Sequence, residues 1–501
     1  MLQPKGTPPF SGAPRALLYN LAFVPPAASS TLLDPPRAQA HLVRQLGPVS
    51  ATALVVSNMI GVGIFTTTGF LAGDLGQAWL VTGIWLFGAA LALAGALCYS
   101  ELSINLPRSG GEYVYLSEAW GPAWGFIDGW VSFFAGFSAP IAAAALAISA
   151  YLAYFFPALA ADAPGALVIP LAVTELRLGG AQLVAAAVVG VFTAINLVGV
   201  SQVARLQNVL TATKLVVIGA FIVLGFTVGA GDWAHFSQPA VRTSSSPLPA
   251  QFAISLIFVF YGYSGWNAAA YVAEEIRDPE RTLPRALVLG TLAVAMLYLA
   301  LNVLYIYAAP LDELKGVVAV GALAAAALFG DRGGGLFSGA MAVSLLATVN
   351  AMCMIGPRVY YAMARDGAFF AAAGRVHPRW NSPWIAVLAQ GACCVALILT
   401  GTFESLVYYI GFTLFFFSAL SVLALFEFRR RPGWKRTRWV DAGYPLIPLA
   451  YVGMNAWVFL YFSRLRRWEA LWSLLTVLGG ALFYQFYVRA RKAPAPDSRT
   501  P

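Results

Sequence analysis

Residues 50–73 read SATALVVSNMIGVGIFTTTGFLAG, an apolar run that is long enough to cross a bilayer and carries Gly61-Val62-Gly63 near its middle. Glycine weakens a helix and lets backbone polar groups turn toward a cavity. A second run at residues 251–275, QFAISLIFVFYGYSGWNAAAYVAEE, carries a similar interruption from Tyr261 to Asn267, five predicted helices later. Such a pair of glycine-broken helices indicates two inverted five-helix halves with a ligand site between them.

The composition around these runs is that of a membrane protein. The 501 residues are 59% hydrophobic and only 11% charged, with a mean hydropathy of +0.72, which is too apolar for a soluble globular chain. The sequence therefore predicts an all-α polytopic membrane protein with about 12 transmembrane helices. The predicted spans are residues 45–68, 79–104, 120–156, 180–200, 206–230, 250–273, 284–309, 336–362, 384–401, 404–427, 444–463 and 468–488.

Lysine and arginine divide unevenly between the two sides of this predicted bundle. Of 31 such residues, 23 fall on the side that holds the N-terminus and seven on the other, while Lys214 lies inside a span. Since basic residues gather in cytoplasmic loops, both termini are predicted to be cytoplasmic. The net charge of +9 then reflects topology, as does the run Arg429-Arg430-Arg431, and no nucleic-acid partner is expected.

The chain divides into a membrane domain and two polar ends. Residues 1–44, rich in Pro, Ala and Ser, are predicted to be a disordered cytoplasmic N-terminal tail, and residues 491–501 a cytoplasmic C-terminal tail. Because a pair of broken helices is typical of transporters, residues 45–490 are predicted to be a transporter domain. Its predicted parts are a first repeat at about 45–230, a second repeat at about 250–427 and two extra helices at about 444–488.

The two interruptions have the chemistry to hold a zwitterion. Freed N–H groups at the start of a half-helix can bind a carboxylate, and freed carbonyls at the end of the other half can accept from an ammonium. Asn58, Ser264 and Asn267 lie beside them. The alternative is that the glycines only allow close helix packing, as small residues do throughout membrane bundles.

Lys214 is a charge inside the fifth predicted span, LQNVLTATKLVVIGAFIVLGF. An ammonium in a membrane span costs energy and is a functional-site hypothesis by default. If it faces the interior, its fixed charge could replace a sodium ion, which predicts transport without a sodium gradient. The alternative is that its side chain reaches the cytoplasmic interface.

Four stretches carry a family resemblance. They are SNMIGVGIF (57–65), YSELSINLPRSGGEYVYLSEAWGP (99–122), YSGWNAAAYVAEEIRDPERTLPRAL (263–287) and GPRVYYAMARDGAFFAAAGRVHPRWNSPWIAV (356–387). On these motifs the chain resembles the amino acid-polyamine-organocation (APC) superfamily, and within it the L-amino-acid transporter (LAT, light-subunit) branch, over roughly residues 45 to 490.

This resemblance implies a LeuT-like fold of ten helices in two inverted repeats, with helices 1 and 6 discontinuous, followed by two more. It implies that Gly61, Val62 and Gly63 bind the substrate carboxylate, and that carbonyls of Met59 and Ser264 bind the ammonium. Ile60 belongs to the same segment. Tyr261 matches an aromatic gate. Val62 departs from the branch, which usually has serine there. Further implied positions are Gly265, Trp266, Asn267, Asn302 and the helix 5 lysine, Lys214.

The remaining polar motifs favour structural roles. Gly262-Tyr263-Ser264-Gly265 resembles a nucleophile elbow, but its second glycine comes one residue early and no strand precedes it. Because His41, His235 and His377 lie in tails or loops on different sides, no enzyme, metal or cofactor is expected. Glu101 and Glu112 with Arg108 are predicted to brace a cytoplasmic loop.

No covalent partner subunit is expected either. In animal members of the branch a cysteine between helices 3 and 4 links a glycoprotein, but the connection at residues 157–180 contains none. The four cysteines, Cys98, Cys353, Cys393 and Cys394, all fall in predicted spans and are interpreted as small core residues.

The sequence thus predicts a multi-pass protein of the cell (inner) membrane that carries amino acids by alternating access, independently of sodium. Neutral L-amino acids are favoured, because no carboxylate is evident beside the two interruptions. Exchange, facilitated uptake and proton symport remain open. The alternatives are a polyamine or cationic amino-acid transporter of the same fold, and an amino-acid sensor that moves no substrate.

Overall fold

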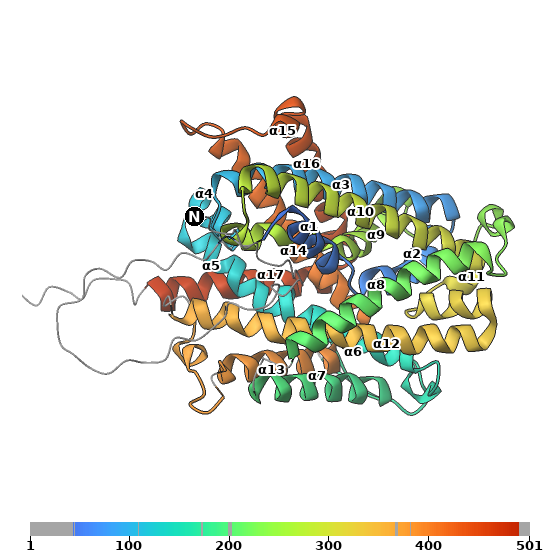
Figure 1. Cartoon of the computed structure of the whole chain (residues 1–501). Helices are drawn as coiled ribbons and strands as arrows, with labels where there is room; N and C mark the ends of the chain where they lie inside the picture. Colours follow the sequence, from blue (N-terminus) through green and yellow to red (C-terminus); the bar gives the residue numbers. More distant parts are fainter. Residues whose placement is uncertain are drawn as a thin grey trace, which may run out of the picture. The chain divides into compact units, whose positions relative to one another are not determined.

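The computed structural model describes residues 44, 46–108, 110–171, 174–198, 203–365, 369–380 and 382–489. Apart from residue 44, the predicted tails at residues 1–44 and 491–501 lie outside these ranges. The described part is almost entirely helical (Figure 1).

The α-helices are α1 (Pro48–Met59), α2 (Gly63–Leu75), α3 (Ala78–Asn105), α4 (Glu112–Trp120), α5 (Pro122–Val131), α6 (Ala139–Leu152), α7 (Gly180–Val198), α8 (Val203–Thr227), α9 (Leu248–Tyr263), α10 (Pro279–Ala308), α11 (Leu311–Leu314), α12 (Val320–Arg365), α13 (Trp384–Thr400), α14 (Phe403–Phe428), α15 (Arg438–Ala442), α16 (Leu446–Leu465) and α17 (Arg467–Phe483). Four short 3-10 helices are η2 (Pro157–Leu159), η3 (Trp233–Ser237), η4 (Ala268–Glu275) and η5 (Ala371–Gly374), and two π-helical turns are η1 (Ser132–Ser138) and η6 (Tyr484–Val488).

Among the described residues, nine helical stretches are long and apolar enough to cross a membrane, and the bent pair α1 and α2 makes a tenth. Two shorter apolar helices, Ala212–Thr227 within α8 and Trp384–Thr400, fall at the predicted fifth and ninth spans. The all-α polytopic architecture is therefore confirmed. The count of twelve stays a prediction.

The helices differ from the predicted spans most clearly at α12. The sequence placed this span at residues 336–362, but the helix begins at Val320 and bends at Gly330, where φ is +75°. Asp331, Arg332 and three consecutive glycines resemble a loop, yet the apolar, alanine-rich residues before them form a further helical segment. Alanine has the highest helix propensity, so residues 320–329 form a helical piece of their own, which is joined to the predicted span across the kink at Gly330.

A small hairpin lies between α6 and α7, in a connection that the sequence did not predict to contain strands. Strands β1 (Leu167–Pro170) and β2 (Glu175–Leu178) pair antiparallel, with Leu167 opposite Leu178 and Pro170 opposite Glu175. All four residues of β1 are exposed.

Both predicted helix breaks are present. Helix α1 ends at Met59 and α2 begins at Gly63, with a bend of 45° between them. The second break follows α9, where Gly265 takes a φ of +92° that favours glycine, and the chain continues as η4. Helix α2 packs against α9, and α1 packs against α10 and η4, so the two broken elements lie together (Figure 1).

A buried ion pair holds the segment that follows α14 against α3. Arg429 donates from Nε and Nη2 to the two carboxylate oxygens of Glu101, each at 2.7 Å. Glu101 also accepts from the Trp434 indole at 2.9 Å and from the Thr437 N–H at 3.0 Å. Burial opposes the charge of Arg429, but these bonds to Glu101 raise its pKa above the ordinary value.

Arg429 therefore has a structural role in addition to the role in membrane topology that the sequence indicated. Its side chain is 4% exposed, whereas its neighbour Arg430 is 80% exposed. A buried charge of this kind needs a matched partner, and Glu101 supplies it with good geometry.

Candidate functional site

The first break presents two carbonyl groups that already have partners. The Met59 carbonyl accepts from the Tyr298 hydroxyl at 2.6 Å and from the Gly61 N–H at 2.7 Å. The next carbonyl, of Ile60, accepts from the ammonium of Lys214. Ile60 leaves the helical conformation, with ψ at 80°, and this turns its carbonyl out of the helix.

Lys214 lies in the protein interior. Its residue is 5% exposed, and its ammonium points from α8 to the break between α1 and α2. This is the position that the interior interpretation of the sequence requires, whereas a side chain reaching an interface would be exposed. Its role in transport stays a prediction.

Helix α2 begins at the residues that are predicted to contact the substrate carboxylate. Val62 caps this helix, and Gly63 and Ile64 begin it. The first N–H groups of a helix have no acceptor within it, and they carry the positive end of its dipole. The geometry is therefore suited to an anion, and Val62 contributes a backbone group even though its side chain lacks a hydroxyl.

Two glycines allow the broken segments to touch. A Cβ built on Gly63 would lie 2.5 Å from the Cα of Gly262 and 3.0 Å from its nitrogen. A Cβ on Gly265 would lie 3.0 Å from the backbone carbonyl of Asn58. Because real Cβ atoms do not approach backbone this closely, both contacts depend on the absence of a side chain. These contacts match the packing interpretation of the glycines, and the binding interpretation stays a prediction.

Tyr261 and Ser264 lie beside this contact. The Tyr261 ring is 3.4 Å from the Cβ position of Gly63, and its centroid is 6.4 Å from that of Phe403 in an edge-on arrangement. The Ser264 hydroxyl donates to the Tyr261 carbonyl at 2.8 Å. The structure thus brings together Met59 to Gly63, Tyr261, Ser264, Gly265 and Lys214.

Three other predicted residues contact different parts of the bundle. The Trp266 ring packs 4.7 Å from the Tyr99 ring on α3. The Asn302 amide oxygen accepts from Thr68, farther along α2, at 2.8 Å. Asn267 donates to Glu112 at 2.6 Å. Trp266 and Asn302 are buried at 3% and 0% exposure, so both have the surroundings of core residues.

Glu112 is the residue whose importance the sequence did not reveal. It is 7% exposed at the start of α4, and it accepts from Asn267, from Tyr99 at 3.0 Å and from Tyr271. Three donors thus converge on one carboxylate next to the second break. The sequence grouped Glu112 with Glu101 and Arg108 as the brace of a loop, but Glu101 pairs with Arg429 and Arg108 pairs with Glu118.

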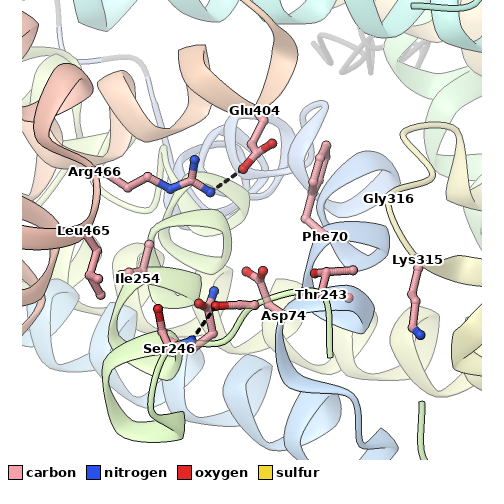
Figure 2. Close-up of a pocket in the computed structure, with 13 residues that line it drawn as sticks. Phe70, Asp74, Thr243, Ser246, Ile254, Lys315, Gly316, Glu404, Leu465 and Arg466 are labelled. Atoms are coloured by element: carbon pink, nitrogen blue, oxygen red, sulfur yellow. Dashed lines mark hydrogen bonds and ion pairs between the residues drawn. The ribbon is translucent and has the colours of Figure 1, made fainter. Parts of the chain in front are cut away.

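A separate pocket lies at the end of the bundle where α2 finishes and α9 begins (Figure 2). None of the predicted site residues lines it. Glu404 and Arg466 form an ion pair there at 2.6 Å. Among the described residues, no cluster of three or more His, Cys, Asp or Glu side chains could hold a metal ion.

Comparison with known proteins identifies one family along nearly the whole chain. The model of the amino acid permease family matches residues 46–482. Among similar proteins, the serine/threonine exchanger SteT of Bacillus subtilis (strain 168) is 29% identical over 423 residues, which is 83% of this chain and 90% of SteT.

Two mammalian relatives match over similar lengths. The b(0,+)-type amino acid transporter 1 of Mus musculus is 29% identical over 460 residues, covering 89% of this chain and 88% of the relative. The large neutral amino acids transporter small subunit 2 of Homo sapiens is 28% identical over 446 residues, covering 87% of this chain and 78% of the relative.

Proposed function

The chain belongs to the amino acid permease family, and on this premise we propose that it carries neutral L-amino acids by alternating access, without sodium. The family and its named relatives are transporters, so the chain is a membrane transporter and not an enzyme. The resemblance to the amino acid-polyamine-organocation superfamily, including its LAT branch, is likewise confirmed.

The substrate site that we propose is the contact between the two breaks. The carboxylate binds the first N–H groups of α2 at Val62 and Gly63, and the ammonium binds carbonyls of Met59 and Ser264. Tyr261 closes over the ligand. The observation that carries this proposal is the close approach of Gly63 to Gly262, which joins a helix N-terminus to the end of another half-helix.

Sodium independence rests on Lys214. Its ammonium donates to the Ile60 carbonyl, which gives that carbonyl a fixed cation as partner. A cation that the protein itself supplies in this place removes the need for a transported one. Exchange is supported by the name of one relative, a serine/threonine exchanger. Proton symport is the alternative form of coupling.

We further propose a cell-membrane location with both termini cytoplasmic, two inverted repeats at about residues 45–230 and 250–427, and no disulfide-linked heavy subunit. The last point is supported by the positions of the four cysteines. They are free thiols, and each lies in a helix of the bundle: Cys98 in α3, Cys353 in α12, and Cys393 and Cys394 in α13.

The test is uptake of labelled alanine, leucine, serine or threonine into proteoliposomes in sodium-free buffer. Uptake that requires unlabelled amino acid inside identifies an exchanger, and uptake that follows an imposed pH gradient identifies a proton symporter. Uptake that requires sodium would contradict the role given to Lys214. Binding without uptake would favour the sensor, and uptake of a polyamine or of arginine alone would contradict the neutral substrate class.

A further inference from the structure

The pocket of about 500 Å³ in Figure 2 has walls from several elements. Asp74 lies near the end of α2, and Gln251 lies in the first turn of α9. Thr243 belongs to the segment before α9, and Glu404 to the first turn of α14, which Thr402 caps through the Ser405 N–H at 3.1 Å. We call this space the mouth pocket.

The two carboxylates that line the mouth pocket differ in whether a cation pairs with them. The Glu404 carboxylate accepts from Arg466, which also donates to the Tyr408 hydroxyl at 3.1 Å and lies over its ring. Lys315, on the opposite wall, pairs with Asp312. Asp74 instead accepts from the Ser255 hydroxyl at 2.7 Å, and among the described residues no cation lies within ion-pair distance of its carboxylate.

An aromatic layer separates the mouth pocket from the helix breaks. Phe70, which lines the pocket, stacks on Phe258 at 5.1 Å and on Phe403 at 6.0 Å. On the other side of this layer, Tyr261 meets Phe403 edge-on. Asp74 lies eleven residues after Gly63 in the same helix, about 16 Å farther along its axis. A single amino acid cannot contact both positions.

We propose that the mouth pocket is a second binding site for the same amino acids, with Asp74 as the anchor for their ammonium group. This inference rests on the proposed function. An ammonium and a carboxylate form a charge-assisted hydrogen bond that a neutral acceptor does not match. Thr243 and Ser244 line the same space and offer hydroxyl donors of the kind that a ligand carboxylate needs.

The same charges define a substrate class. Asp74 carries the unpaired negative charge and repels an acidic side chain, so neutral amino acids are accepted at the mouth pocket and acidic ones are rejected. Because Asp74 lies about 16 Å along α2 from Gly63, a side chain added at Gly63 should leave the mouth pocket free to bind its ligand.

The experiment is a count of bound ligand on the purified full-length chain, by equilibrium dialysis with tritiated L-leucine and L-serine. We expect two equivalents for the unaltered protein, one for Asp74→Asn and one for Gly63→Val, which crowds only the helix breaks. Glu313→Gln removes an exposed carboxylate at the same end of the bundle and should retain two. Excess L-glutamate should not displace the equivalent that depends on Asp74.

The proposal for the mouth pocket would be overturned if the unaltered protein bound one equivalent and Gly63→Val abolished it. It would also be overturned if Asp74→Asn still bound two equivalents, or if neither ligand bound at all. Size-exclusion elution checks folding, and if Gly63→Val misfolds, the counts for the unaltered protein and Asp74→Asn decide alone. Failure of transport with an intact Asp74-dependent equivalent would overturn the proposed function and not the pocket.

Discussion

The two helix breaks use their polar groups differently. At the first break, the carbonyls of Met59 and Ile60 are held by Tyr298 and Lys214, which come from α10 and α8. At the second break, the chain is tied through a side chain, because Asn267 donates to Glu112 on α4. The first break is thus held through its backbone carbonyls, and the second is held through the Asn267 side chain, two residues after Gly265.

This difference predicts that the first break acts in substrate binding and the second in the conformational change. Backbone carbonyls held by two neighbouring helices provide a rigid surface for a ligand, whereas the side-chain hydrogen bonds from Asn267 and Tyr271 to Glu112 can release when the bundle changes conformation. Changes at the first break should therefore alter binding, and changes at these side-chain hydrogen bonds should alter turnover. Four substitutions test that difference, from the largest expected effect to the smallest.

Gly63→Val should abolish measurable uptake. The new side chain would collide with Gly262, and overpacking of this kind costs about 1–3 kcal/mol, or roughly 5- to 150-fold in affinity. Ligand titration measures the loss. Gly219→Val is the matched control, because a Cβ on this exposed glycine of α8 meets nothing within 4 Å. Unchanged affinity in Gly63→Val would place the substrate elsewhere.

Lys214→Ala should reduce uptake by about 10- to 100-fold, since a hydrogen bond from a charged group is worth about 1.5–3 kcal/mol. Membrane insertion should be normal, because removing a buried charge does not oppose it. The exposed Lys435, which pairs with Glu280, provides the control Lys435→Ala. Full transport activity of Lys214→Ala in proteoliposomes would exclude a coupling role.

Glu112→Gln should lower kcat by about 10-fold and leave KM nearly unchanged. The substitution keeps the shape but weakens the acceptor for Asn267 and Tyr271, at a cost of about 1–2 kcal/mol. Glu118→Gln removes a half-exposed carboxylate paired with Arg108 and should have little effect. A rise in KM with normal kcat would show that Glu112 acts in binding, against the predicted difference between the two breaks.

Tyr298→Phe should tighten substrate binding by a few-fold, about 1 kcal/mol at most. The Met59 carbonyl accepts two hydrogen bonds here, and removing one leaves a lone pair for the substrate ammonium. Tyr305→Phe is a fitting control, because the Tyr305 hydroxyl is buried without a hydrogen-bond partner among the described residues. Weaker binding in Tyr298→Phe would mean that its hydroxyl positions the carbonyl.

The sequence was most informative where a local pattern causes the structure. Glycines inside apolar runs predicted both helix breaks, and the lengths of the apolar runs predicted most of the long helices. Lys214 was noticeable because a charge in a span is rare. In each case the signal and its structural effect lie within a few residues of one another.

Contacts between distant residues could not be predicted in this way. Asn267 and Glu112 are 155 positions apart, so nothing near either one indicates the other. Trp266 was assigned to the site by resemblance, but its ring packs on Tyr99. Arg429 and Arg430 are adjacent and chemically identical, yet only the fold decides that one is buried and the other exposed.

The ion pair between Glu101 and Arg429 also has a consequence for how the protein is made. The two residues are 328 positions apart, so at a synthesis rate of about 5–20 residues per second the carboxylate waits roughly 15 to 65 seconds for its partner. During this interval Glu101 must stay near water or be protonated, because an unpaired carboxylate is costly in apolar surroundings. A nascent chain that stops before Arg429 would expose an unpartnered acid, which is a feature that quality-control machinery can recognise.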